Sequence, residues 1–292
     1  EAGQAWAAAH PADPAAARLC NAYPDVGFIV LDLRLHPRTQ IAWREAALTA
    51  ARALGKRDYE GAHLGSLGNR FSELGEQRRA IEYQEQALII IREIGDKRNE
   101  GTILNSLGLD WAALGEPRRA IEYHEQALVI AREIGDRRGE GNALGSLGNA
   151  YLSLGEPRRA IDYYEQHLVI TRQIGDRRGE GNALGNLGNA YLSLGEPRRA
   201  IDYYEQVLVI MREIGDRRSE GCALGNLGSA WADLGESHRA IEYYEQALVI
   251  DREIGDRRGE GCALGNLGLA WADLGAPRRA IEYHEQALVI DR

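Results

Sequence analysis

A 40-residue repeat is the feature of this sequence that most constrains its fold. Residues 137–176 and 177–216 differ at only four positions, and six such copies follow one another from about residue 57 to the C-terminus. A fixed period of this length is the signature of a repeat array, in which each unit packs only against its neighbours. The 292 residues therefore need not divide into the separate globular cores that a chain of this length usually forms.

Each copy is predicted to contain two helices, here called helix A and helix B. In residues 177–216, helix A has apolar residues at spacings of three and four, namely Leu184, Leu187, Tyr191 and Leu194. Helix B has two adjacent apolar stripes, which predict that it is buried over a wide face. One stripe comprises Ala200, Tyr203, Val207, Ile210 and Ile214, and the other comprises Ile201, Tyr204, Leu208 and Met211.

Turn and capping residues predict where these helices begin and end. Gly195 suits the left-handed position after helix A, and Pro197 suits the first turn of helix B. Gly175 suits the end of the preceding helix B, and Asp176 is placed to cap the next helix A. Connections this short force antiparallel neighbours, so the sequence predicts a stack of helical hairpins.

These residues resemble the tetratricopeptide repeat. The Leu-Gly, Tyr, Ala and aromatic pattern of that family is matched by residues 186–191 and then by Gly195, Ala200, Tyr204 and Leu208. Units of the family are about 34 residues long, whereas these have 40 residues and are similar to the long units of kinesin light chains and Pins-type adaptors. The resemblance covers residues 57–292. It implies an all-α, right-handed superhelical solenoid of antiparallel helix pairs that binds protein segments in its concave groove.

Residues 1–56 lack the repeat and are interpreted as a helical linker or cap. Residues 1–10 and 12–21 are predicted to form short helices, separated by prolines. Residues 26–35 are apolar, and their type of structure is left open. Residues 38–54 are similar to a degenerate helix B and are expected to cap the stack.

Residues 31–34 (Leu-Asp-Leu-Arg), followed by Pro37, resemble the linker before the repeats in bacterial NB-ARC-type STAND ATPases. The chain begins without a methionine and ends inside the repeat pattern, so we expect it to be a piece of a larger protein. The resemblance implies a ligand-sensing region of a signalling protein, with the nucleotide-binding domain upstream of Glu1. A free-standing adaptor is the alternative.

Helix A also has a polar face that is rich in asparagine. At about 100° per residue, Asn182, Asn186 and Asn189 lie opposite its apolar face, and the family resemblance implies that this side lines the groove. Asparagine in a helix costs roughly 0.5 kcal/mol relative to alanine, so folding alone gives no reason for a row of asparagines. A carboxamide can both donate to and accept from the backbone of an extended peptide. The alternative is that asparagine only keeps the groove solvated.

The copies differ along this face although their scaffold is nearly identical. The position of Asn189 is Asn, Leu, Asn, Asn, Ser and Leu in the six copies, whereas the position of Leu187 is always leucine. A uniform stack with a variable groove predicts a defined ligand register, with a polar middle and an apolar, acid-edged C-terminal end. The predicted peptide-binding groove comprises Asn142, Asn149, Asn182, Asn186, Asn189, Asn226, Ser229, Asp233, Asn266 and Asp273.

Other conspicuous side chains are predicted to be structural. Three other copies have a tryptophan at the position of Tyr191, and these side chains are expected to lie in the core: Trp111, Trp231 and Trp271. His124 and His284 are expected to be partly exposed. Cys222 and Cys262 are expected to act as small apolar fillers.

The loops and the glycines of helix A carry further expectations. Asp-Arg-Arg loops such as residues 176–178 are expected to be capped, solvated turns, and the alternative is a clamp for an acidic partner. Gly188 is expected to admit a close helix contact. Gly181 and Gly185 are expected to lower the stability of helix A itself, so that stacking between helices holds it.

Composition and motifs argue against several classes of function. The net charge of −9 argues against nucleic acid as a partner, and no apolar run is long enough to span a membrane. Three cysteines, an odd number, indicate a reducing, cytoplasmic location. His63, His167 and His238 share no helical face, so neither a metal nor another cofactor is expected.

The sequence therefore predicts a non-catalytic scaffold with a protein or peptide ligand, because no Ser/His/Asp or Cys/His pairing is supported by spacing. The alternative function is a self-association module. The last helix B would expose an apolar stacking face at Ala287 and Ile290, through which a terminal repeat could join another.

Overall fold

The computed structural model describes residues 2–10, 13–22 and 37–290, and every regular element within these ranges is an α-helix. The all-α prediction is confirmed. The chain divides into two compact units, residues 1–150 and 151–292, and each is built from antiparallel helices that pack side by side. The division falls within α9 (Arg137–Ser153).

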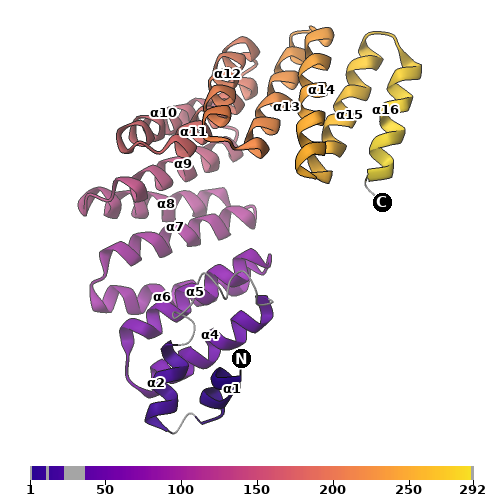
Figure 1. Cartoon of the computed structure of the whole chain (residues 1–292). Helices are drawn as coiled ribbons and strands as arrows, with labels where there is room; N and C mark the ends of the chain where they lie inside the picture. Colours follow the sequence, from indigo (N-terminus) through magenta and orange to yellow (C-terminus); the bar gives the residue numbers. More distant parts are fainter. Residues whose placement is uncertain (1, 11–12, 23–36, 291–292) are drawn as a thin grey trace. The chain divides into compact units, whose positions relative to one another are not determined.

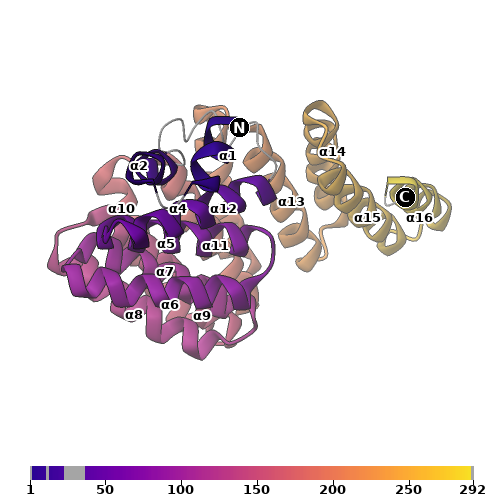
Figure 2. The same cartoon turned by 90° about the horizontal axis from the view of Figure 1, so that it is seen from below.

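In the described part of the first unit, helices α1, α2 and α4 come before the repeats, and successive hairpins follow (Figure 2). Its helices are α1 (Ala2–Ala9), α2 (Pro14–Ala22), α4 (Pro37–Ala53), α5 (Arg57–Glu73), α6 (Gln77–Ile94), α7 (Lys97–Ala113), α8 (Pro117–Glu133) and most of α9. The helices predicted for residues 1–10, 12–21 and 38–54 are confirmed as α1, α2 and α4. The apolar segment 26–35, with its linker-like residues, lies outside the described residues.

The second unit continues the same alternation of helices A and B (Figure 1). Its helices are α10 (Pro157–Ile174), α11 (Arg177–Ser193), α12 (Pro197–Ile214), α13 (Arg217–Asp233), α14 (Ser237–Ile254), α15 (Arg257–Asp273) and α16 (Pro277–Ile290). Helices B pack between helices A, as α12 does against α11 and α13 and α14 against α13 and α15.

The turns form as the sequence predicts. The Asp176 carboxylate caps α11 by accepting a hydrogen bond from the backbone N–H of Gly179 at 2.9 Å. Gly175 ends α10 and Gly195 follows α11, with φ of +70° and +74°, a left-handed conformation that favours glycine. Pro197 is the first residue of α12, where it needs no backbone N–H.

The apolar faces of the two helices meet in the core. On α11 Leu184 and Leu187 are buried, and on α12 Tyr204 and Met211 are buried opposite them. The predicted core is confirmed at its centre, whereas three outer members are only partly buried: Leu194, Tyr203 and Ile214. Each fully buried large apolar side chain contributes about 1.5–3 kcal/mol, so packing between helices stabilises the stack more than helix propensity does.

Two glycines of α11 lie directly against side chains of α12. A Cβ atom at Gly188 would lie 2.5 Å from Cε1 of Tyr204, and one at Gly181 would lie 2.0 Å from Cε of Met211. The close contact predicted at Gly188 is confirmed. At Gly181 the end of the Met211 side chain occupies the space that a side chain would need. At Gly185 the nearest atom would be 3.9 Å away, which leaves room for a methyl group.

The tryptophans lie at the edge of the core, whereas we predicted that they lie inside it. All three are partly exposed, whereas Tyr191 at the same position is buried. An arginine of the following helix covers each indole, with its guanidinium carbon 4.4, 4.4 and 4.3 Å from the ring centre. The indole is larger than a phenol ring, so part of it extends past the core and the cation covers its face. The three pairs are Trp111 with Arg119, Trp231 with Arg239, and Trp271 with Arg279.

Candidate functional site

In the second unit, the asparagine-bearing face of helix A is accessible to solvent. Asn182 and Asn189 of α11 are exposed, and Asn186 is partly exposed. Eight predicted groove residues belong to this unit and are here called the second-unit face: Asn182, Asn186, Asn189, Asn226, Ser229, Asp233, Asn266 and Asp273. The other two, Asn142 and Asn149, are exposed on α9 in the first unit.

The exposed Asn189 is held by a buried tyrosine of the next helix. The Tyr204 hydroxyl, on a side chain with 0% exposure, donates to Oδ1 of Asn189 at 2.6 Å. Burial raises the pKa of Tyr204, and the charge of Asp233 adds to the shift, so the hydroxyl keeps its proton and remains a donor. Because Oδ1 is occupied, the Nδ2 amide group of Asn189 is the part that remains available as a donor.

In other copies too, the residue at the position of Asn189 is related to the residue at the position of Tyr204 on helix B. In the second unit the Tyr244 hydroxyl donates to Oγ of Ser229 at 3.2 Å. Where helix B has a histidine instead of this tyrosine, helix A has a leucine: His124 accompanies Leu109, and His284 accompanies Leu269. Asn189 therefore has a role in folding, which corrects the expectation that folding gives no reason for an asparagine there.

The remaining asparagines of the face lack such a role. Within the described part of the chain, the side chains of Asn182, Asn186 and Asn226 form no hydrogen bond to another side chain. Asparagine lowers helix stability relative to alanine, and nothing in the core compensates for it at these positions. Their carboxamides are free to bind a ligand on the face of α11 and α13.

Cys222 and Cys262 lie on this face and are not the apolar fillers that we predicted. Both thiols are free and exposed, at the positions that correspond to Asn182. Because both side chains are exposed to solvent, they fill no space in the core.

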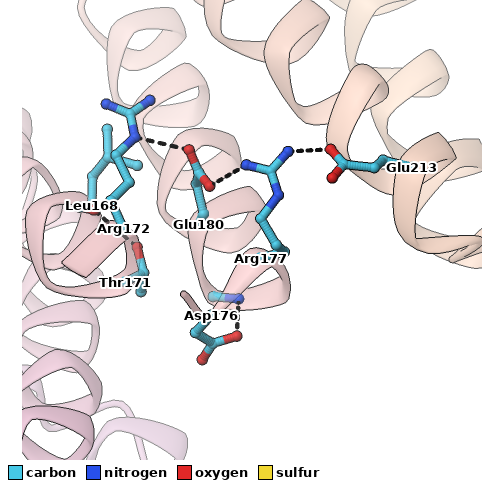
Figure 3. Close-up of polar contacts among 8 residues, drawn as sticks. Leu168, Thr171, Arg172, Asp176, Arg177, Glu180 and Glu213 are labelled. Atoms are coloured by element: carbon cyan, nitrogen blue, oxygen red, sulfur yellow. Dashed lines mark hydrogen bonds and ion pairs between the residues drawn. The ribbon is translucent and has the colours of Figure 1, made fainter. Parts of the chain in front are cut away.

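The loops at the ends of the hairpins contain an ion-pair network that crosses from one repeat to the next (Figure 3). Nε of Arg172 donates to Oε1 of Glu180 at 2.8 Å, and Nη1 of Arg177 donates to Oε2 of the same carboxylate at 2.5 Å. Arg177 also donates to Glu213 of the next helix B. Burial raises the pKa of Glu180, but the hydrogen bonds from both arginines outweigh it, so the pKa lies below its ordinary value.

This network corrects the interpretation of the Asp-Arg-Arg loops. Asp176 caps its helix as expected, but Arg177 is engaged within the protein, and Arg178 pairs with Asp216 at 3.2 Å. These arginines therefore bind carboxylates of their own repeat and are not a free clamp for an acidic partner. The signal that could have revealed this is a glutamate at one position in every copy: Glu60, Glu100, Glu140, Glu180, Glu220 and Glu260.

Two histidines, His124 and His284, replace the tyrosine of helix B and pack against a glycine of helix A. His124 is buried at 1% exposure, and its Nδ1 lies 2.9 Å from Oδ1 of Asn105. Its predicted partial exposure is therefore wrong, because the ring packs against Gly108, whereas His284 is partly exposed as expected. Burial lowers the pKa of His124 to about 4. In the part of the chain that the structure describes, no three His, Cys, Asp or Glu residues are grouped so that they could hold a metal.

No helix in the described ranges has the length and apolar character needed to cross a membrane.

Family models described as tetratricopeptide repeat match residues 99–173 and 219–292, residues 183–218 and residues 61–94. The first of these models alone matches about half of the 292 residues. No curated protein sequence matches the chain significantly.

Several solved structures share the fold at low sequence identity. A STAND protein with a tetratricopeptide repeat sensor, from Pyrococcus horikoshii, matches with a TM-score of 0.76 and 18% identity over 98% of this chain and 43% of its own. A putative kinesin light chain from Podosopora anserina matches with a TM-score of 0.56 and 21% identity over 64% of this chain and 93% of its own. The quorum sensor NprR from B. thuringiensis, in its apo form, matches with a TM-score of 0.58 and 13% identity over 91% of this chain and 85% of its own. The chain thus spans less than half the length of the STAND protein.

Proposed function

Because this chain belongs to the tetratricopeptide repeat family, we propose that it is a non-catalytic scaffold that binds an extended protein or peptide segment on its helix-A faces. The observation that carries the proposal is the contrast between Asn189, whose orientation the buried Tyr204 fixes, and Asn182 and Asn226, which have no partner among the described side chains. Together they offer oriented donors and acceptors on an accessible surface.

The spacing of these carboxamides suits an extended backbone. Asn182 and Asn189 are two turns apart on α11, a separation of about 10 Å along the helix axis. About three residues of an extended peptide cover the same distance. Peptide N–H and C=O groups can therefore reach successive carboxamides, each of which both donates and accepts.

The C-terminal end of the second-unit face has acidic and apolar side chains, so it suits different ligand side chains. Asp233 and Asp273 are exposed there, and Leu269 is 61% exposed at the position of Asn189. We propose that the bound segment has a basic residue facing the two carboxylates and an apolar residue facing Leu269. The charges would then favour encounter as well as orientation.

We further propose that the array is the ligand-sensing region of a larger cytoplasmic signalling protein of the STAND type. The match over 98% of this chain to a STAND protein with such a sensor supports this proposal. A ligand that binds one arrangement of the repeats more tightly would shift an attached ATPase between states, by its difference in affinity for the two. A gene whose reading frame upstream of residue 1 encodes no Gly-Lys-Ser/Thr phosphate loop would contradict this part of the proposal.

Self-association through α16 is a second candidate, and one observation favours it. Ile281 and Leu288 are 56% and 63% exposed, whereas Ile241 and Leu248 at the same positions of α14 are 6% and 7% exposed under α15. A second copy could cover this face. Sedimentation of the chain and of Leu288→Glu tests it: a dimer that the substitution converts to monomer supports self-association, and a monomer in both cases excludes it.

Selection of peptides from a random display library against the whole chain tests the binding proposal. We expect enriched peptides whose affinity falls roughly 30-fold for Asn182→Ala/Asn226→Ala, because each lost backbone pair costs about 1 kcal/mol. The matched control is Gln206→Ala, which removes an exposed amide from the outer face of α12. If no peptide is enriched, or if the double variant and the control bind alike, the proposed surface is wrong.

A further inference from the structure

A pocket opens on the first unit between α7, α8 and the start of α9. Its cavity volume is about 100 Å³, below the roughly 300–1,000 Å³ of sites that hold a whole small-molecule ligand, so it suits a single side chain. Its floor is formed by Ala127, Ile130 and Ala131, and its polar rim includes Thr102, Asn105 and Asn142. We call it the Ala131 pocket.

The pocket exists because α8 has alanine at two positions where other helices B have at least one larger side chain. The paired positions in the six copies are Ala87 and Ile91, Ala127 and Ala131, His167 and Thr171, Val207 and Met211, Ala247 and Asp251, and Ala287 and Asp291. No other copy has alanine at both positions. The sequence of this one repeat thus leaves space that the others fill.

The glycines facing these positions show how the space is filled elsewhere. A Cβ at Gly61 would lie 2.9 Å from Cδ1 of Ile91, and one at Gly181 would lie 2.0 Å from Cε of Met211. At the equivalent Gly101, the nearest atom would belong to Ile130 and lie 3.4 Å away. The side chain of Ala131 does not reach this glycine, so the space between α7 and α9 stays open.

The rim has a second feature that is specific to this repeat. Asn105 stands where the other five copies have glycine. Its Oδ1 is paired with Nδ1 of the buried His124 at 2.9 Å, which leaves its Nδ2 group as a donor at the mouth of the pocket. Arg98 and Asp136 also line the pocket and bring one charge of each sign, so the rim has no preference for a ligand of either charge.

We propose that the Ala131 pocket is an anchor subsite for one large aliphatic or aromatic side chain of a peptide segment bound to the helix-A face of the first unit. This inference rests on the proposed peptide-binding function and adds a specificity-determining position to it. The apolar floor receives the side chain, and Nδ2 of Asn105 donates to a backbone carbonyl beside it. A buried apolar anchor with hydrogen bonds at its edge is the usual form of a recognition hot spot.

Filling the pocket with a side chain that the fold already accepts tests the inference. Ala131→Met introduces the residue found at the position of Met211, and the matched control Ala247→Val introduces the residue found at the position of Val207 in the second unit. The probes are the N-acetyl amides of leucine, phenylalanine, alanine and aspartate, followed by backbone ¹H–¹⁵N NMR, and the peptides selected on the whole chain. Circular dichroism checks that both variants keep the wild-type helix content.

We expect the leucine and phenylalanine amides to shift signals of α7, α8 and α9, and the other two amides to shift none. Their affinity and that of the selected peptides should fall at least fivefold in Ala131→Met and stay unchanged in Ala247→Val. Selected peptides that bind Ala131→Met as tightly as wild type would overturn the pocket while leaving the proposed function intact. Amides that bind the pocket when no peptide is selected would support the pocket as a small-ligand site and overturn the proposed function. Absence of binding by every probe would overturn both.

Discussion

The buried hydroxyl of Tyr204 donates to the exposed carboxamide of Asn189 across 2.6 Å, and so connects the core of a repeat to its accessible face. Tyr244 makes the equivalent bond to Ser229, whereas histidine at this position accompanies leucine on the face. Leucine on the exposed face is therefore matched by histidine in the helix behind it, and tyrosine there accompanies a polar residue that accepts its hydrogen bond.

This relationship predicts different stability effects for two asparagines on one helix. Asn189→Ala should lower the free energy of unfolding by about 1 kcal/mol, because the buried Tyr204 hydroxyl loses its acceptor. Asn182→Ala should leave it unchanged or raise it by up to about 0.5 kcal/mol, because alanine is the better helix former. Urea unfolding of the two variants checks the difference. Equal effects would mean that the hydrogen bond contributes nothing to stability.

The glycines of α11 should respond in opposite directions to the same substitution. Gly188→Ala should destabilise the protein by about 1–3 kcal/mol, because its methyl group would lie 2.5 Å from the Tyr204 ring. Gly185→Ala should stabilise it by up to about 1 kcal/mol, because the nearest atom lies 3.9 Å away and alanine favours the helix. Thermal unfolding followed by circular dichroism measures both. A stabilising Gly188→Ala would contradict the close helix contact.

The ion-pair network should make Glu180 more important for stability than Glu213, the other carboxylate that Arg177 binds. Glu180→Gln should lower the free energy of unfolding by about 1–3 kcal/mol, since Glu180 is buried and accepts from two arginines. Glu213→Gln should cost less than about 1 kcal/mol, since that carboxylate is exposed. The folded-state pKa of Glu180 lies below its ordinary value of 4.5, so its contribution is present above that pH and is lost as the pH falls below it. Urea unfolding at pH 7 and pH 4 should show the Glu180→Gln difference shrinking.

His124 should make the protein less stable in mild acid. Its pKa is about 4 when folded and 6.5 ordinarily, so the unfolded chain binds the proton more tightly between these values. Stability is then complete above pH 6.5 and falls by about 3 kcal/mol as the pH decreases toward 4. His124→Gln, with the residue that Gln84 supplies at the same position, should flatten this part of the pH profile of unfolding. An unchanged profile would show that His124 is not the group responsible.

Most of the fold could be predicted from the sequence because each turn, cap and apolar spacing recurs in the six copies of the repeat. The turn glycines such as Gly195, the cap at Asp176 and the apolar spacing of Leu184 and Leu187 all depend on neighbours within one hairpin. The features that could not be predicted concern contacts between segments. Gly181 is close to Met211, about 30 residues away, and the helical period does not show which side chain fills the space above a glycine.

The candidate site could be predicted only in part for the same reason. Helix periodicity placed Asn182 and Asn189 on the exposed face, but it could not distinguish the free carboxamide from the one bonded to Tyr204. The Ala131 pocket depends on the absence of side-chain volume at two positions, which no motif describes. Once the structure identifies which positions face one another, comparison of the copies within the chain shows where side-chain volume is missing.

Side-chain ¹H–¹⁵N NMR of the asparagines tests the central claim most directly. A peptide selected on the whole chain should shift the carboxamide signals of Asn182, Asn189 and Asn226, because these groups would bind its backbone. The control signal is the carboxamide of Gln206, which donates to the backbone carbonyl of Asp202 on α12 and should not move. Shifts at Gln206 with unmoved signals from the three asparagines would contradict the assignment of the ligand to the helix-A face.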